Sequence, residues 1–280
     1  MGVLYFRRMQ FWKYQGTGND FILVDQRSHL WIRRNDTEHI ARLCDRHFGI
    51  GADGLILLNT HPVRDFEMVY FNADGRESTF CGNGGRCIVA FAYRLGIRRE
   101  RYTFIAADGE HEARLFISDV PRRFWVELRM RDVGPMAPCA NPISGEKGFV
   151  VNTGSPHYIE WVDNLKGRNV SEEGRRVRYA ECFQPGGVNV NFVELDPEGI
   201  GLRTYERGVE AETLACGTGV TAAALAWHVR VQLPPGTYEV PVFARGGTLR
   251  VRFTATASGY TDIWLCGPAE EVFSGEIDVP

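Results

Sequence analysis

A short cysteine-containing motif occurs twice in the chain, and it constrains the possible fold more than any other feature. The first copy is Cys-Gly-Asn-Gly at residues 81–84, and the second is Cys-Gly-Thr-Gly at residues 216–219. A strongly apolar run follows each copy, at residues 88–93 and 221–227, and a glutamate stands four residues before each cysteine. Apolar runs without a polar face are typical of helices that are buried on all sides. The pattern therefore predicts two related halves, each presenting one thiol at the start of a buried helix.

The position of each cysteine favours chemical reactivity. Glycines allow a sharp turn into a helix and a close approach of the backbone to a ligand. The first N–H groups of a helix have no partner within it, so they point at whatever occupies the turn. A thiol at this point ionises more easily because the helix end favours negative charge. One cysteine in a glycine-rich turn is more often structural than reactive, but two matched copies are hard to attribute to packing alone.

Further elements follow from local patterns. Residues 9–25 predict a β-hairpin with Asn19 near its tip, where an asparagine serves equally well as a turn residue or a ligand contact. A helix is expected to begin at Asp36 or Thr37 and to end near Gly49. The Pro- and Gly-containing stretch 132–142 is expected to be an inter-domain linker. Strands are expected at residues 55–58, 66–71, 102–106, 112–117, 125–129, 149–152, 188–192, 202–205, 238–243, 248–253 and 260–265.

Six segments, in order along nearly the whole chain, resemble the diaminopimelate epimerase family. They are residues 14–21, 71–75, 81–84, 154–157, 205–208 and 215–219. The resemblance implies an α/β (α+β) fold with two pseudo-symmetric domains, each an antiparallel, barrel-like sheet around a central helix. The domains would be residues 1–130 plus 268–280, carrying Cys81, and residues 131–267, carrying Cys216. The last strand would return to the N-terminal domain.

The resemblance also implies an activity, the interconversion of LL-2,6-diaminopimelate and meso-diaminopimelate in lysine and peptidoglycan biosynthesis, with no cofactor. One of Cys81 and Cys216 would be the thiolate base and the other the thiol acid. Their roles would exchange with the direction of the reaction. Which thiol takes the proton from which isomer stays open.

The family's site residues carry over onto matching positions of this chain. His157 and Glu206 would tune the ionisation of the thiols, although from its residue type alone His157 also fits a loop histidine, and Arg207 also fits a surface ion pair with Glu206. At two further positions of the binding site this chain departs from the family: Gly54 stands where many members have glutamine, and Ser155 where asparagine is usual. Phe273 occupies a position linked to homodimer formation. The expected substrate-binding residues are Asn19, Asn72, Gly82, Asn83, Asn189, Glu206, Arg207, Gly217 and Thr218.

Composition restricts the partners to small molecules. The net charge of −3 gives no attraction to nucleic acid or to anionic membranes. No apolar run approaches the roughly 20 residues of a membrane span. The seven cysteines form no regular framework, which favours a reducing cytoplasm, and none has zinc-site spacing, so no metal is expected. Either Met1 or Met9 fits as the start of translation.

Two alternatives stay open. A racemase of proline, hydroxyproline or histidine, in the same superfamily, also uses paired Cys-Gly turns, but proline racemases typically carry histidine where Asn83 stands and lack the Tyr-Glu-Arg-Gly pattern at 205–208. A thiol redox switch, in which Cys81 and Cys216 form a reversible disulfide, belongs to a different class and requires Cα atoms within about 7 Å.

Overall fold

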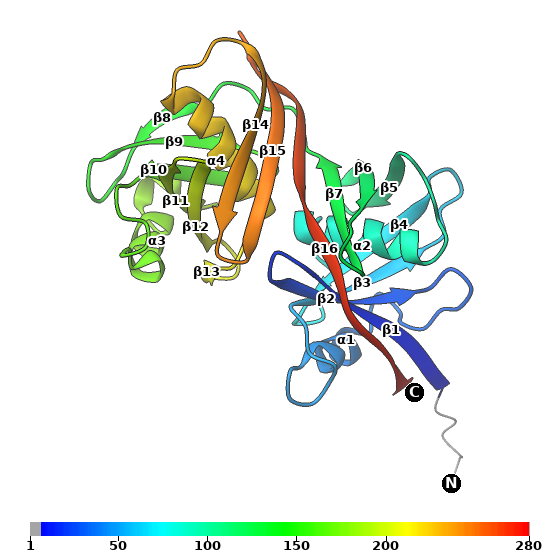
Figure 1. Ribbon diagram of the computed structural model, residues 1–280. Helices are drawn as coiled ribbons and strands as arrows, with labels where there is room; N and C mark the ends of the chain where they lie inside the picture. Colours follow the sequence, from blue (N-terminus) through cyan, green and yellow to red (C-terminus); the bar gives the residue numbers. More distant parts are fainter. Residues whose placement is uncertain (1–6, 280) are drawn as a thin grey trace. The chain divides into compact units, whose positions relative to one another are not determined.

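The protein was analysed as a computed structural model that describes residues 7–279, so Met1, one of the two alternative starts, lies outside the described residues. The chain divides into two compact units (Figure 1). Unit 1 comprises Met1–Leu128 and Pro268–Pro280, and unit 2 comprises Arg129–Gly267. The long strand β16 (Gly259–Val279) begins in unit 2 and ends in unit 1. Its end pairs with the first strand of the chain, which confirms the expected return of the last strand.

Unit 1 is a closed barrel of eight strands. The strands follow in chain order from β1 to β7, and β16 lies between β7 and β1 and closes the barrel. Most neighbours are antiparallel, but β2–β3 and β4–β5 are parallel. The strands other than β16 are β1 (Arg7–Gly16), β2 (Asn19–Asp25), β3 (Gly54–Asn59), β4 (Phe66–Asn72), β5 (Tyr102–Ala106), β6 (Gly109–Ile117) and β7 (Arg123–Arg129).

The barrel of unit 1 surrounds helix α2 (Gly82–Arg94), which packs against β1, β2, β3, β4 and β6. Successive side chains of a strand point to opposite faces of the sheet, so alternate residues of the same strands pack on a second helix. This helix, α1 (Thr37–Cys44), buries Ile40, Leu43 and Cys44 in a cluster with Ile22 and Val24 of β2. The apolar face of α1 thereby covers this side of the sheet.

Unit 2 repeats the plan with a sheet ordered β16-β15-β14-β12-β11-β10-β9-β8, and β13 pairs with β12. The β10–β11 and β12–β14 pairs are parallel, and the others are antiparallel. Helix α3 (Val170–Arg178) and a short 3-10 helix (Glu181–Phe183) complete the unit, with α3 packed on β11 and β12. The new strands are β8 (Ala137–Ala140), β9 (Lys147–Asn152), β10 (Pro156–Trp161), β11 (Asn189–Asp196), β12 (Gly199–Glu206), β13 (Ala211–Thr213), β14 (Gly236–Ala244) and β15 (Gly247–Thr256).

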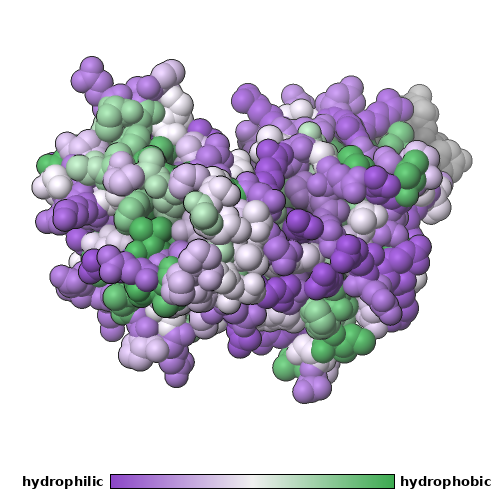
Figure 2. Space-filling view, turned by 90° about the horizontal axis from the view of Figure 1, so that it is seen from above, coloured by the Kyte–Doolittle hydropathy of each residue, from purple (hydrophilic) through white to green (hydrophobic). Residues whose placement is uncertain are grey.

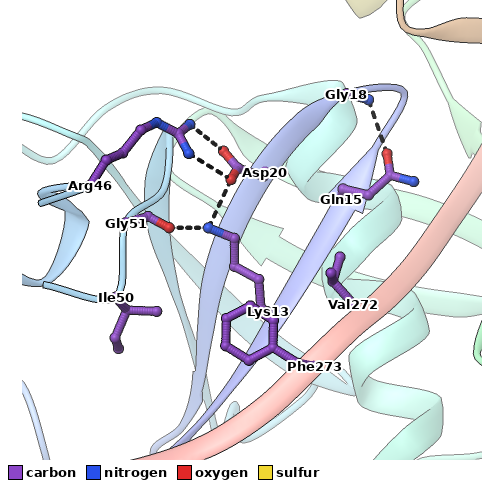
Figure 3. A pocket seen from close by; sticks show the side chains of 9 residues that line it. All are labelled: Lys13, Gln15, Gly18, Asp20, Arg46, Ile50, Gly51, Val272 and Phe273. Carbon is purple, nitrogen blue, oxygen red and sulfur yellow. Dashed lines mark hydrogen bonds and ion pairs between the residues drawn. The ribbon is translucent and has the colours of Figure 1, made fainter.

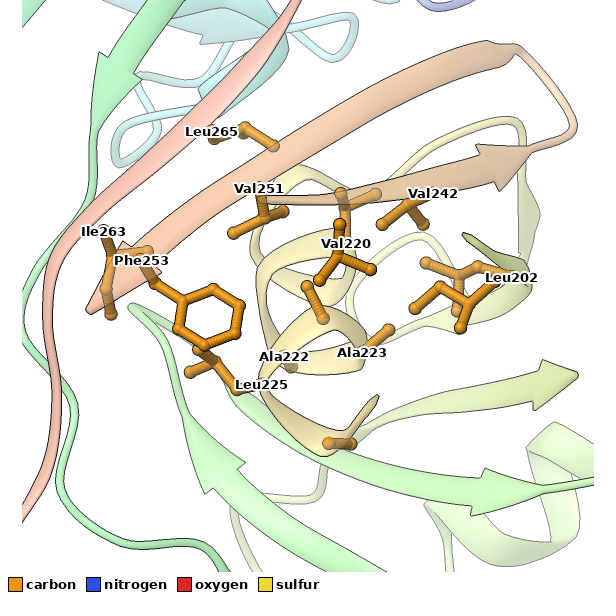
Figure 4. Packing of buried hydrophobic residues seen from close by; sticks show 14 of the residues in the cluster. Leu202, Val220, Ala222, Ala223, Leu225, Val242, Val251, Phe253, Ile263 and Leu265 are labelled. Atoms are coloured by element: carbon orange, nitrogen blue, oxygen red, sulfur yellow. The ribbon is translucent and has the colours of Figure 1, made fainter. Parts of the chain in front are cut away.

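Helix α4 (Gly217–Arg230) forms the centre of unit 2, and Figure 4 shows it beneath strands β14 and β15. Its alanines at 222–224 are fully buried, and small side chains let the surrounding strands approach closely. Larger residues such as Val220, Leu225 and Phe253 fill the remaining space. Full burial of each such large apolar side chain contributes roughly 1.5–3 kcal/mol. Both cysteine-led helices are therefore confirmed as buried central helices, and so is the predicted fold class.

Two local expectations are wrong, and some elements were not expected at all. Helix α1 ends at Cys44 rather than near Gly49, because the Asp45 carboxylate accepts the N–H groups of His47 and Phe48, both at 2.7 Å, and turns the chain. The stretch 132–142 is not only a linker, since it contains β8, which pairs with β9. Strand β10 and helix α3 were not expected from the sequence.

Figure 2 shows a mostly hydrophilic face on which apolar residues gather in patches. Among the described residues, none of the helices has the length and apolarity that a membrane crossing requires.

Candidate active site

The two cysteines occupy equivalent positions at the starts of α2 and α4. Cys81 has φ −115° and ψ 120°, and Cys216 has φ −115° and ψ 112°. Their carbonyl groups accept the first helical hydrogen bonds, from Gly85 N at 2.7 Å and Val220 N at 2.8 Å. Neither cysteine side chain makes a capping hydrogen bond to its own helix. The N–H groups in the first turn of a helix have no partner within it, so the starts of α2 and α4 favour a negative charge beside each cysteine.

In unit 1, the hairpin tip supplies an acceptor for the Cys81 thiol. Asn19 Nδ2 donates to Asp53 Oδ2 at 2.7 Å, and this bond to a carboxylate fixes the orientation of the amide. Asn19 Oδ1 then accepts from Cys81 Sγ at 3.7 Å and from Asn83 Nδ2 at 3.3 Å. Three residues expected at the site, Asn19, Cys81 and Asn83, therefore lie together.

A buried arginine below this cluster was missed by the sequence reasoning. Arg86 is fully buried, and its Nη2 donates to Thr17 Oγ1 at 2.8 Å and to Asn83 Oδ1 at 3.1 Å. Its Nε donates to the carbonyl oxygen of Pro268 at 3.3 Å. Arg86 thus joins the hairpin tip, helix α2 and strand β16. Its position within an otherwise apolar helical run was the available signal.

Asn72 and Gly54 lie opposite each other at the ends of β4 and β3. The side chain of Asn72 is exposed, and its backbone N–H donates to the carbonyl of Arg76 at 3.0 Å. A Cβ atom at Gly54 would lie 2.5 Å from the carbonyl oxygen of Phe71 and 2.6 Å from the ring of Tyr70. The local backbone thus leaves no room for the glutamine that many family members carry at this position.

A pocket of about 510 Å³ lies beside the hairpin of β1 and β2 (Figure 3). The Lys13 ammonium in its wall is 2.7 Å from Asp20, which also pairs with Arg46 at 2.8 Å. Burial alone would raise the pKa of Asp20, but hydrogen bonds from Arg46 and Lys13 outweigh it and lower that pKa. Phe273 lines the pocket, is 42% exposed and meets the ring of Phe11 edge-on at 6.0 Å.

In unit 2, a chain of hydrogen bonds leads from His157 to the second thiol. His157 Nε2 lies 2.9 Å from Thr218 Oγ1, which lies 3.5 Å from Cys216 Sγ. His157 is fully buried near the start of β10, so it is not a loop histidine. Burial, with a smaller contribution from the charge of Arg207, lowers the pKa of His157 to about 3. The imidazole is therefore neutral at physiological pH.

Three other expected residues of unit 2 lie at the end of β12 or hydrogen-bond to it. Asn189 Oδ1 accepts from Arg207 N at 2.8 Å, and Arg207 Nη1 donates to the carbonyl of Gly186 at 3.1 Å. Glu206 accepts a hydrogen bond from Thr213 Oγ1 at 2.9 Å, and burial raises the pKa of Glu206. No ion pair joins Arg207 to Glu206 in the part of the chain that the structure describes, so the alternative of a simple surface pair is wrong.

The turn before β10 is fastened to the same helix end. Thr153 Oγ1 donates to the carbonyl of Thr218 at 2.8 Å, and Thr153 N donates to the carbonyl of Ser155 at 3.2 Å. Ser155 therefore contributes to this turn through its backbone carbonyl group. The sequence did not single out Thr153, because its role depends on a contact with a residue 65 positions away. Within residues 7–279, no three His, Cys, Asp or Glu side chains gather as a candidate metal site.

Comparison with known sequences gives a consistent result. A family profile described as diaminopimelate epimerase matches residues 11–122 and 149–267. The chain is 45% identical to a diaminopimelate epimerase of Flavobacterium psychrophilum, over 96% of this chain and 100% of that protein. It is 42% identical to one from Chlorobaculum tepidum (94% and 98% covered) and 39% identical to one from Aquifex aeolicus (96% and 98% covered).

Solved structures share the fold at low sequence identity. A phenazine biosynthesis protein of the PhzF family from Bacillus anthracis has a TM-score of 0.74 and 14% identity, with 98% of this chain and 100% of that chain covered. A hydroxyproline epimerase from Agrobacterium vitis has a TM-score of 0.65 and 16% identity, with 98% and 93% covered. These likenesses concern the fold alone.

Proposed function

This chain belongs to the diaminopimelate epimerase family, and on that basis we propose that it interconverts LL-2,6-diaminopimelate and meso-diaminopimelate without a cofactor. The observation that carries the proposal is the pair of cysteines with nearly identical backbone geometry, each at the start of a buried helix. Inversion at an α-carbon requires a base on one face and an acid on the other. Two equivalent thiols meet this requirement and can exchange roles with the direction of the reaction.

The energetic difficulty is the acidity of the α-carbon. Each pKa unit between the carbon acid and the thiol costs about 1.36 kcal/mol, so charge must be stabilised as it develops. Backbone N–H groups of Gly82, Asn83, Gly217 and Thr218 are the proposed donors to the substrate α-carboxylate. Fixed donors at helix N-termini need no reorganisation during the reaction, which makes them effective in the transition state.

The far end of the substrate carries a second ammonium and a second carboxylate. We assign its recognition to Asn19, Asn72, Asn189, Glu206 and Arg207, which together supply both donors and acceptors. A guanidinium such as that of Arg207 matches a carboxylate in a two-point contact. His157 and Glu206 would adjust the ionisation of the thiols. The reaction would belong to lysine and peptidoglycan biosynthesis, as the family resemblance implies.

A solvent-exchange assay tests the proposal. The reduced protein, free of pyridoxal phosphate, is incubated in D2O with LL-diaminopimelate, and with proline and histidine in parallel, while NMR follows the α-proton. We expect conversion to the meso isomer, lost in both Cys81→Ala and Cys216→Ala and retained in Cys182→Ala, a matched change at an exposed cysteine. Exchange only with proline or histidine would overturn the substrate assignment. If none of the three amino acids exchanges its α-proton, the proposed enzymatic activity is refuted, and the thiol redox switch remains as the alternative function.

We also propose that the protein acts as a homodimer in the cytoplasm. Phe273 is the proposed dimer contact, supported by its 42% exposure beside the exposed Val272. The cytoplasm is supported by the seven cysteines, all within the described residues and none in a disulfide. Light scattering during gel filtration should give a dimer for the unaltered protein and a monomer for Phe273→Asp; an unaltered protein that runs as a monomer would contradict the dimer.

A further inference from the structure

Asn191, on β11 beside His157 on β10, is not among the residues assigned to proton transfer, thiol ionisation or substrate binding. Its side chain is fully buried. Its Nδ2 donates to the carbonyl oxygen of Tyr158 at 2.9 Å and lies 3.0 Å from His157 Nδ1. Its Oδ1 accepts from Thr204 Oγ1 at 3.0 Å. Because the carbonyl of Tyr158 can only accept, the amide nitrogen must face it, and this fixes which end of the carboxamide meets the imidazole.

The orientation of Asn191 determines where the imidazole proton lies. The Asn191 amide nitrogen is a donor, so His157 Nδ1 must accept and carries no proton. A neutral imidazole then holds its proton on Nε2, which donates to Thr218 Oγ1, 2.9 Å away. Thr218 Oγ1 accepts from the imidazole and keeps its own proton available to donate. A thiolate at Cys216 has no proton to give, so the Thr218 hydroxyl is then the donor in the 3.5 Å contact with Sγ. A hydrogen bond donated to sulfur favours the thiolate over the thiol.

We propose that Asn191 is a positioning residue: it holds His157 in the Nε2-protonated tautomer, so that Thr218 donates a hydrogen bond to the sulfur of Cys216. The inference deepens the proposed function and rests on it for its catalytic meaning, because it makes Cys216 a sulfur prepared to accept the substrate proton. Its statement about the tautomer and the thiol can be tested without substrate. Asn191, His157, Thr218 and Cys216 all lie in unit 2.

The tautomer in the unaltered protein is the first test. Long-range ¹H–¹⁵N correlation spectra distinguish a protonated ring nitrogen from a bare one, and the His157→Gln variant identifies which of the seven histidines gives the signal. The proposal requires a protonated Nε2 and a bare Nδ1 for His157. A protonated Nδ1 would overturn it.

Asn191→Asp is the second test, because it replaces the donor by an acceptor of the same shape. Nδ1 of His157 should then gain the proton, and Thr218 should turn its hydroxyl proton toward the imidazole. We expect iodoacetamide to alkylate Cys216 about tenfold more slowly, the loss expected for a hydrogen bond to a charged group, as measured by mass spectrometry of the Cys216 peptide. Asn164→Asp, the same change at an exposed turn residue of unit 2, is the control and should leave the rate unchanged. An unchanged rate in Asn191→Asp together with a protonated Nδ1 would overturn the proposal.

Thr218 offers a third test that does not depend on folding of the Asn191 variant. Thr218→Val removes the hydroxyl but keeps the side-chain shape, and Thr218→Ser keeps the hydroxyl. Cys216 should be alkylated more slowly in the valine variant than in the serine variant, and equal rates would contradict the relay. If the unaltered protein shows the expected tautomer and alkylation but no epimerisation, the proposed function fails while this inference stands.

Discussion

Alanine substitutions at two equivalent glycines should differ in their effect on stability. Gly84 and Gly219 each stand three residues after a cysteine, in the first turns of α2 and α4. A Cβ atom at Gly219 would lie 2.6 Å from Asn191 Oδ1 and 3.3 Å from His157 Cε1. A Cβ atom at Gly84 would meet the ends of the flexible side chains of Ile56 and Met68, at 3.0 and 3.3 Å. Only the first clash involves a buried group held by hydrogen bonds.

The expected change in the free energy of unfolding for each variant follows from this difference. Relief of the Gly219 clash requires a shift of roughly 0.8 Å to reach an ordinary 3.4 Å contact, and overpacking of this kind costs about 1–3 kcal/mol. Replacing glycine by alanine in a helix returns up to about 1 kcal/mol. Gly219→Ala should therefore destabilise the protein by up to about 2 kcal/mol, whereas Gly84→Ala should change its stability little. The shift at Gly219 also moves Asn191 against His157, so the epimerisation rate should fall as well.

Urea unfolding and the epimerase assay, run on both variants, check this prediction. Gly219→Ala should lower both the unfolding midpoint and the turnover rate. Gly84→Ala should keep a midpoint near that of the unaltered protein. A Gly84→Ala variant that is at least as damaged as Gly219→Ala would refute the reasoning, because helix propensity or the glycine backbone would then matter more than the hydrogen-bonded side chains of unit 2.

Three further predictions concern titratable groups that are wholly or partly buried. Asp20→Asn should lower the unfolding free energy by roughly 3 kcal/mol, since it leaves the buried Lys13 ammonium without its carboxylate; a loss below 1 kcal/mol in urea titrations would contradict the ion pair. The pKa of His157 is lowered to about 3, so its contribution to stability is complete above the unfolded pKa of about 6.5 and is lost as the pH falls toward 3. His157→Gln should remove this part of the pH dependence, and an unchanged profile would argue against a neutral, buried imidazole. The pKa of Glu206 is raised by burial, so its contribution is complete at low pH and is lost as the pH rises through that pKa. Glu206→Gln should therefore gain stability relative to the unaltered protein as the pH rises above the ordinary glutamate pKa of about 4.3, and a relative loss would contradict the burial.

The repeated cysteine motif was sufficient to predict the two central helices, for a physical reason. Cys81 and Cys216 each open a glycine-containing turn that leads into an apolar run without a polar face, which is typical of a buried helix, and both adopt extended backbone angles at the helix start. Strand positions were also predictable where apolar residues alternate with polar ones, as in β5 (Tyr102–Ala106). Local patterns of this kind depend only on residues close in sequence.

Elements without such patterns were missed. Helix α3 (Val170–Arg178) is mostly polar, and its two valines give too short an apolar stripe to indicate a helix. Strand β8 contains Pro138, which is typical of turns and edge strands, and β8 is at the end of the strand order of its sheet. The early end of α1 depends on the Asp45 side chain, whose hydrogen bonds to His47 and Phe48 no periodicity reveals.

Supporting residues of the site depend on contacts between distant segments. Parallel pairing of β10 with β11 places His157 opposite Asn189 and brings Asn191 to the imidazole. Arg86 reaches Thr17 across 69 positions. The sequence identified the thiols and the polar residues that match the family, but it gave no reason to connect Asn191 or Arg86 with them.

The central claim is that two thiols act on opposite faces of one α-carbon, and the early fate of deuterium tests it most directly. LL-diaminopimelate is converted in D2O, and the isomers are separated and analysed by mass spectrometry during the first few per cent of reaction. Two separate proton donors and acceptors predict one deuterium in the meso product and almost none in the remaining LL substrate. Deuterium entering the LL substrate as fast as the meso product would show that one group serves both faces, and the two-thiol mechanism would be wrong.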